Sequence, residues 1–207
     1  METSVNIFPL FSSPLAALKI DGDFSKIKKS VTKTKYRKTI ATDAPGSQIS
    51  ENLNILDNFP EEKQLLMDTW NGYNKNFLGY TTTDFQITTS WITKTAPDGH
   101  SQFHNHRNSF YSAVLYFDDI LGGNIEFDSM GVLPKQLLVN DPIDWTIYNC
   151  NSFTYTPEKN VVLFFPSYLY HRVTTNTSGK NRYSLAFNLF PINQFGEGDS
   201  SVNIKLV

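Results

Sequence analysis

The sequence predicts a mainly β protein, built as an antiparallel sandwich or barrel with a few flanking helices. Short segments rich in β-branched and aromatic residues follow one another from residue 84 onward, bounded by Gly, Pro and Asn. These segments are 84–93, 109–118, 122–128, 160–166, 181–190 and 201–207. No helical pattern separates them, which favours antiparallel connections. The 16 Phe and 10 Tyr residues would supply the core of such a fold.

Length and composition narrow the class of protein. A chain of 207 residues predicts a single domain, 1–207, with a core at about 84–207 and a flanking strand and helix region at 1–83. A net charge of -2 does not favour nucleic-acid binding. The single cysteine, Cys150, excludes an internal disulfide and favours the cytoplasm. The most apolar stretch, "VVLFFPSYLY", is too short to cross a membrane, so no membrane partner is expected.

One helix is expected over residues 60–77, packed outside a sheet. Pro60 suits the first turn, and the acids Glu61 and Glu62 suit the positive end of a helix. An apolar stripe at helical spacing then needs a sheet to cover it, and its members are Leu66, Trp70, Tyr73 and Phe77.

Three other segments read as edges, turns or loops. The segment 26–38 holds seven of the 18 basic residues and no acid, which indicates a solvated edge strand or loop, or else a surface for an anionic partner. The segment 43–52 is turn-like. The segment 128–160 is irregular and is interpreted as a long excursion, with the length of a functional lid.

The histidines supply the first chemical signal. His104 and His106 are separated by one residue, so on a strand both would point to the same face, about 7 Å apart along the chain. Imidazole is a common ligand for transition metals, and His171, at the end of an apolar segment, could add a third ligand from a neighbouring strand. Three ligands on one side leave a metal open to substrate. A lone His-x-His pair is also compatible with ordinary structural histidines.

A second signal lies on the segment 181–190. Alternation along a strand puts Arg182 and Ser184 on one face, together with Ala186 and Asn188, and an apolar set on the other face. An arginine that faces the inside of a barrel is costly unless an anion pairs with it. A guanidinium beside a hydroxyl is well suited to bind a carboxylate, although a salt bridge to an Asp or Glu of the chain would also satisfy it.

Together these phrases resemble the Fe(II)/2-oxoglutarate-dependent dioxygenase superfamily. "HNHRNSFYSAVLYF", "FFPSYLYHRV" and "RYSLAFN" are similar to a set of oxygenases in it with a His-x-His pair, and "SAVLYFDD…GGNIEF" resembles prolyl-hydroxylase-like members. The resemblance implies a double-stranded β-helix, of the jelly-roll or cupin-like kind. It implies that His104, His106 and His171 bind Fe(II), and that 2-oxoglutarate binds the metal with its far carboxylate on Arg182, supported by Ser184 and Tyr116.

One position departs from the superfamily's pattern. His106 stands where most members carry a carboxylate. A neutral imidazole cancels none of the metal's charge, so the site would be more cationic before 2-oxoglutarate binds. The alternatives are that a water or chloride takes this place, or that Asp98 or Glu126 reaches the metal instead.

The expected function is therefore an oxygenase that uses O2 and 2-oxoglutarate, releases succinate and CO2, and hydroxylates a small-molecule or peptide substrate. The metal ligands are the only catalytic residues expected. Two alternatives stay open: a three-histidine zinc or iron enzyme that does not use 2-oxoglutarate, and a non-catalytic jelly-roll binding protein. The sequence does not name the substrate, and it leaves the oligomeric state open, a homodimer included.

Overall fold

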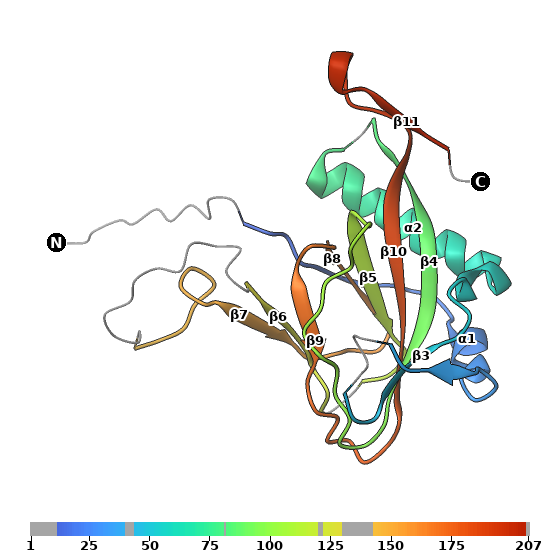
Figure 1. Ribbon diagram of the computed structural model, residues 1–207, viewed down its shortest axis with the longest axis vertical. Coiled ribbons are helices and arrows are strands. Elements are labelled where there is room, and N and C mark those ends of the chain that lie inside the picture. Colours follow the sequence, from blue (N-terminus) through green and yellow to red (C-terminus); the bar gives the residue numbers. More distant parts are fainter. Residues whose placement is uncertain (1–11, 40–43, 81, 120–121, 130–142, 206–207) are drawn as a thin grey trace.

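The structure, a computed structural model, describes residues 12–39, 44–80, 82–119, 122–129 and 143–205 (Figure 1). Its helical segments are α1 (Ser25–Ser30), η1 (Ile55–Asn58), α2 (Pro60–Tyr73), η2 (Asn74–Leu78) and η3 (Gly198–Ser200). Its strands are β1 (Ala16–Lys19), β2 (Tyr36–Arg37), β3 (Ser47–Ser50), β4 (Asp84–Thr95), β5 (Tyr111–Tyr116), β6 (Ile125–Asp128), β7 (Ser152–Tyr155), β8 (Val161–Pro166), β9 (Tyr170–Val173), β10 (Arg182–Phe195) and β11 (Val202–Ile204). None of the helices among these residues has the length and apolar character needed to cross a membrane.

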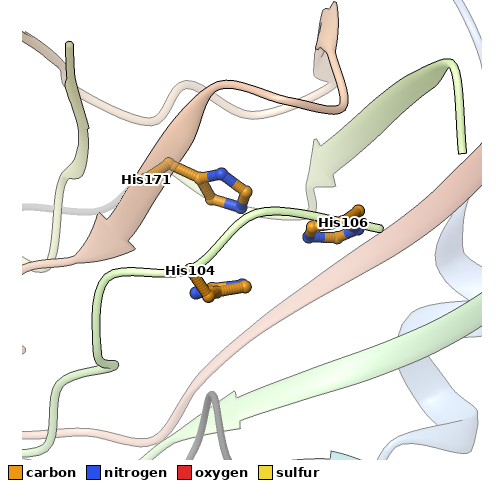
Figure 2. Close-up of side chains that lie close together, drawn as sticks. All are labelled: His104, His106 and His171. Atoms are coloured by element: carbon orange, nitrogen blue, oxygen red, sulfur yellow. The ribbon is translucent and has the colours of Figure 1, made fainter. Parts of the chain in front are cut away.

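Two sheets form a double-stranded β-helix, as predicted. The larger sheet has the order β1-β8-β5-β10-β4-β3-β2, with β11 paired to β10, and every pairing in it is antiparallel. The smaller sheet has the order β7-β6-β9. An isolated bridge between His104 and His171 extends the smaller sheet beyond β9 and places the two histidines side by side (Figure 2).

Strand β10 lies in the middle of the larger sheet, between β4 and β5. Its side chains alternate as the sequence predicts. Leu185, Phe187 and Leu189 belong to the main hydrophobic core, whereas Arg182 and Ser184 face the space between the sheets. Strands β5 and β8 are buried on both faces because each has the core on one side and this inner space on the other, which explains their unbroken apolar sequences.

Helix α2 covers the outer face of the larger sheet (Figure 1). It begins at Pro60 as predicted, and Leu66, Trp70 and Tyr73 are buried against the sheet. The predicted apolar stripe is wrong at Phe77, because the Phe77 side chain is 77% exposed. The α-helix ends at Tyr73 and continues as the π-helical turn η2, whose wider i→i+5 spacing rotates Phe77 away from the sheet.

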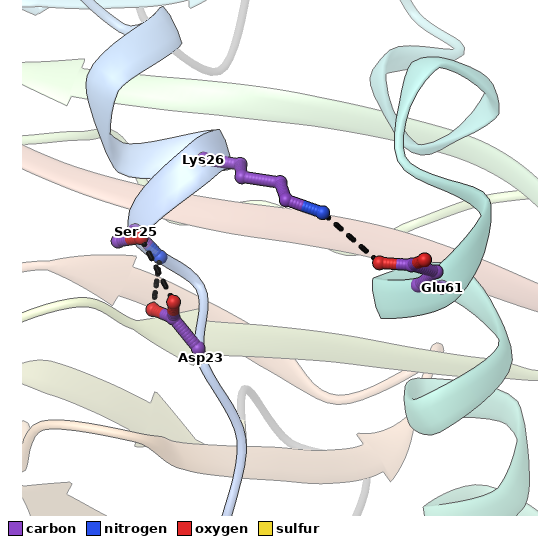
Figure 3. A network of polar contacts seen from close by, with 4 residues as sticks. All are labelled: Asp23, Ser25, Lys26 and Glu61. Carbon is purple, nitrogen blue, oxygen red and sulfur yellow. Dashed lines mark hydrogen bonds and ion pairs between the residues drawn. The ribbon is translucent and has the colours of Figure 1, made fainter.

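The basic segment 26–38 is only in part an edge strand. Its first half is helical, in α1, because Ile27 and Val31 pack into the core one turn apart. The helix starts where Ser25 donates its backbone N–H and its hydroxyl to the Asp23 carboxylate, and Lys26 reaches Glu61 of α2 at 3.0 Å (Figure 3). The second half contains β2, which is indeed the last strand of the sheet.

Two further segments contain strands that the sequence analysis did not predict. Strand β3 lies in the turn-like segment 43–52, where it pairs with β4. Strand β7 lies in the excursion 128–160, at the edge of the smaller sheet. Residues 130–142 of that excursion lie outside the described residues. The predicted lid therefore stays a prediction. Both strands are four residues long and are defined by their partners rather than by a strong local pattern.

The contact between α2 and the sheet generates a stability prediction. The Trp70 ring is buried among four aromatic rings, with centroids 4.7 Å from Tyr111 and 5.0 Å from Phe85, but its indole N–H has no partner. Trp70→Ala should lower the free energy of unfolding by about 3–5 kcal/mol. Trp70→Phe should cost less, because it also removes a buried unpaired donor that costs about 1–3 kcal/mol.

Urea unfolding followed by circular dichroism measures both values. Phe77→Ala is the control on the same helical segment, and it should change stability by no more than about 0.5 kcal/mol. A loss from Phe77→Ala as large as that from Trp70→Ala would contradict the placement of the two rings.

Candidate metal centre

Three histidines from two distant parts of the chain meet between the sheets. His104 and His171 form an antiparallel hydrogen-bonded pair, in which each backbone N–H donates to the other's carbonyl oxygen, at 3.0 and 2.9 Å. His106 is held one step further along, because its N–H donates to the Ser167 carbonyl oxygen at 3.0 Å. The two histidines of the His-x-His pair therefore lie on an extended segment and point to the same side, as predicted (Figure 2).

The three imidazoles are close enough to share one metal ion. One ring nitrogen from each of His104, His106 and His171 lies within 4.8 Å of the other two. The ring centroids are 4.4 to 5.4 Å apart. The fourth histidine, His100, is not in this group. No carboxylate of the described residues joins it either, so neither Asp98 nor Glu126 takes the third position. Glu126 instead forms an ion pair with Arg172 at 2.7 Å.

Hydrogen bonds determine which nitrogen of each ring is free. The Nδ1 atom of His104 lies 2.9 Å from the Gln102 carbonyl oxygen, and that of His171 lies 3.0 Å from the Leu169 carbonyl oxygen. A carbonyl oxygen only accepts, so Nδ1 carries the proton and Nε2 presents its lone pair. This arrangement, with the outer nitrogen bonded to a protein acceptor, is the usual one for histidines that bind metals.

Burial keeps the three rings neutral. It lowers the pKa of His171 well below its ordinary value and that of His106 to about 4, and the nearby imidazoles add to both effects. Burial also lowers the pKa of His104, against the opposing hydrogen bond to Gln102. At neutral pH all three rings are therefore unprotonated at Nε2, the state in which imidazole binds a metal.

Asn188 of β10 orients the third ring, a role that the sequence analysis missed. Its Oδ1 accepts from His106 Nδ1 at 2.7 Å and from the Ser112 hydroxyl at 2.9 Å. Its amide nitrogen donates to Thr89 at 3.1 Å, which fixes the orientation of the amide. The alternation of β10 put Asn188 on the inner face, but only the folded chain shows which side chain it meets there.

The residues predicted to form a carboxylate clamp also line this space. Arg182 is 4% exposed, and its Nε and Nη1 atoms have no hydrogen-bond partner. No acid among the described residues compensates its charge, and burial lowers the pKa of Arg182, against the opposing hydrogen bond with Tyr116. Ser184 is buried on the same strand face, and the guanidinium lies 5.2 Å from the centroid of the buried Tyr116 ring. Burial raises the pKa of Tyr116 to about 12, although the Arg182 charge opposes this, so its hydroxyl stays protonated.

One cavity of about 270 Å³ connects all of these side chains. It is lined by the three histidines, Arg182, Ser184, Tyr116 and Asn188, together with a wall that includes Trp91, Val114 and Phe165. Among the described residues that line it, the charged ones are Arg107 and Arg182, and none is an Asp or Glu. A cavity with three neutral nitrogen ligands and a buried unpaired cation is suited to a divalent metal and an anion bound together.

The comparisons with known proteins agree with this geometry. Residues 89–188 match the model of a family described as "Putative 2OG-Fe(II) oxygenase". The matched segment runs from β4 to Asn188 of β10, and it includes the three histidines, Tyr116, Arg182 and Ser184. No curated protein matches the sequence.

Several solved structures are similar to this chain in fold. HygX from Streptomyces hygroscopicus, with nickel, 2-oxoglutarate and hygromycin B bound, is 9% identical, with a TM-score of 0.58 over 86% of this chain and 83% of its own. A Pseudomonas putida prolyl-4-hydroxylase is 17% identical, with a TM-score of 0.52 over 86% and 94%. A Trichoplax adhaerens prolyl hydroxylase, in complex with a hypoxia inducible factor peptide, is 10% identical, with a TM-score of 0.59 over 85% and 83%.

At these identities the solved structures establish the fold, and the family model adds a sequence match over residues 89–188. The resemblance to the Fe(II)/2-oxoglutarate-dependent oxygenase superfamily that the sequence indicates is thereby confirmed.

Proposed function

We propose that this chain is an Fe(II)- and 2-oxoglutarate-dependent oxygenase that hydroxylates a small-molecule or peptide substrate, with release of succinate and CO2. The observation that carries the proposal is Arg182, a buried guanidinium without an anion, in the same cavity as three unprotonated imidazole nitrogens. A cation in this position is costly unless an anion pairs with it. The proposal takes 1–207 as one oxygenase domain. The single cysteine, Cys150, fits a reducing cytoplasm, which would keep iron ferrous.

The residues present fit the two groups that this chemistry requires. His104, His106 and His171 would hold Fe(II) through Nε2, each kept in that tautomer by its Nδ1 hydrogen bond. Arg182 and Ser184 would bind the far carboxylate of 2-oxoglutarate, with the Tyr116 hydroxyl as a neutral donor beside them. Bound iron supplies the oxidation chemistry with O2. The chain positions the reactants, and the apolar wall of the cavity excludes water.

A three-histidine zinc or iron enzyme that does not use 2-oxoglutarate is the second candidate. It is favoured by one observation, the all-histidine set of ligands, which is common at catalytic zinc. It leaves the buried Arg182 without a ligand. Succinate release from 2-oxoglutarate in air, with Fe(II) against Zn(II) as the added metal, separates the two candidates. Binding of neither metal would favour a non-catalytic binding protein.

The first prediction concerns the metal. Anaerobic titration should show one Fe(II) bound per chain, and His104→Ala or His171→Ala should abolish binding, because two ligands do not hold the ion in an open site. His106→Asp should retain metal, because a carboxylate is the usual ligand at this position of the superfamily. His100→Ala is the control, since His100 lies outside the cluster. A loss in His106→Asp as complete as that in His104→Ala would contradict the equivalence of the two ligand types.

The second prediction concerns 2-oxoglutarate. Removing one partner of a desolvated charge pair costs on the order of 2–5 kcal/mol, so Arg182→Ala should weaken binding by roughly thirtyfold or more. Arg182→Lys should weaken it less, because the charge is kept and the bidentate geometry is lost. Anaerobic calorimetry with Mn(II) gives both affinities, and metal binding should stay intact.

Lys180→Gln, an exposed cation two residues away, is the matched control and should bind 2-oxoglutarate normally. Unchanged binding in Arg182→Ala would remove Arg182 from the clamp but leave the reaction class open. Absence of binding to the wild-type protein at millimolar 2-oxoglutarate would overturn the oxygenase proposal.

The third prediction concerns Asn188. Asn188→Leu removes the acceptor that holds His106 Nδ1, and loss of such a partner typically lowers metal affinity about 10- to 100-fold. Asn188→Asp keeps an acceptor and should lose less. Asn193→Ala is the control further along β10, because Asn193 bonds Asp84 instead. Competition with a fluorescent chelator measures the affinities, and wild-type affinity in a folded Asn188→Leu protein would show that His106 needs no such support.

A further inference from the structure

An arginine at the mouth of the cavity has no role in the proposed chemistry. Arg107 follows His106 directly, lines the cavity and is exposed to solvent. Its side chain makes no hydrogen bond or ion pair with any of the described residues, unlike Arg172, which pairs with Glu126. None of the described residues that line the cavity is an acid, so none of them compensates the Arg107 charge.

Arg107 and Arg182 lie at different ends of this site. His106, the neighbour of Arg107, is bonded to Asn188, whereas Arg182 lies six positions earlier on β10. Six residues of a strand span about 20 Å. Arg182 is buried, whereas Arg107 is open to solvent. A five-carbon diacid that binds the metal and Arg182 therefore leaves Arg107 free for a second anion.

The surroundings of Arg107 suit the body of an organic molecule. Trp91 of β4 lies beside the metal centre, with its ring centroid 5.4 Å from that of His106, and it is half-buried in the cavity wall. Ile49 of β3, which pairs with Thr93 of β4, and Thr39 also line the cavity. An apolar wall with one placed charged group is the usual composition of a specific small-molecule site.

We propose that Arg107 binds an anionic group of the primary substrate, and that this substrate is a small organic carboxylate or phosphate ester whose body packs against Trp91. Such an anion would be attracted by a cavity whose charged lining residues are both arginines. Bound there, it would place a neighbouring carbon near the metal ligand His106, because Arg107 and His106 line the same cavity. The inference rests on the proposed function, since it takes the histidines as the metal site and Arg182 as the co-substrate site.

A paramagnetic relaxation experiment tests the proposal without a known substrate. The protein is loaded with Mn(II) and saturated with N-oxalylglycine, an unreactive analogue of 2-oxoglutarate. Methylphosphonate is then titrated with detection of phosphorus relaxation, and carbon-13-labelled acetate is titrated in a parallel series. A saturable rise in relaxation rate with at least one of the two anions is expected, and the arm that responds identifies the anion type.

Variants of Arg107 and of a control residue test whether the anion binds at Arg107. Arg107→Gln should weaken binding of the responding anion by about fivefold, as for a partly exposed charge pair. Added salt should weaken wild-type binding in the same direction, because the site is open to solvent. Lys180→Gln is the matched control and should bind like wild type. N-Oxalylglycine affinity, measured separately, should be unchanged in Arg107→Gln, because its far carboxylate belongs to Arg182.

Three results would overturn the proposal. They are no saturable effect with either anion, an effect that is equal in Arg107→Gln, and an effect that remains at high salt because the anion binds Mn(II) directly. Failure of the proposed function gives a different result, since the protein would then bind no Mn(II) or no N-oxalylglycine before any anion is added.

Discussion

The central position of β10 is the constraint on which the rest of the structure depends. It pairs with β4 on one side and β5 on the other, so its register is fixed from both edges. Because successive side chains of a strand point to opposite faces, one strand supplies both Leu185 and Phe187 to the core and Arg182 and Ser184 to the cavity. The position of the candidate clamp is thus set by the same packing that stabilises the fold.

The described residues that line the cavity carry an excess of positive charge. Its histidines are neutral, its two arginines are cationic, and none of the described residues that line it carries a carboxylate. Burying Arg182 without an anion among the described residues costs free energy in the folded chain, and a ligand that binds only the folded state offsets such a cost by mass action. The same feature that makes this region unfavourable by itself makes it selective for anions.

The sequence predicted those features of the fold that follow from the spacing of nearby residues. The alternation of β10 and the start of α2 at Pro60 follow from strand and helix geometry, and both are found in the structure. Phe77 could not be placed, because a π-helical turn changes the rotation of the chain. The contact between Asn188 and His106 joins residues 82 positions apart, and no spacing rule reports a contact of that kind.

In the proposed metal site, His106 would be a neutral ligand, and this changes the demands on its surroundings. A dication held by three imidazoles keeps its full charge, whereas the carboxylate usual in the superfamily would cancel one unit of it. The part of the chain that the structure describes places no acid at the site to make up the difference. Even the support for His106 is an amide, Asn188, held in turn by Ser112 and Thr89. Charge balance at such a centre has to come from what binds there, and 2-oxoglutarate, a dianion, carries the two negative charges required.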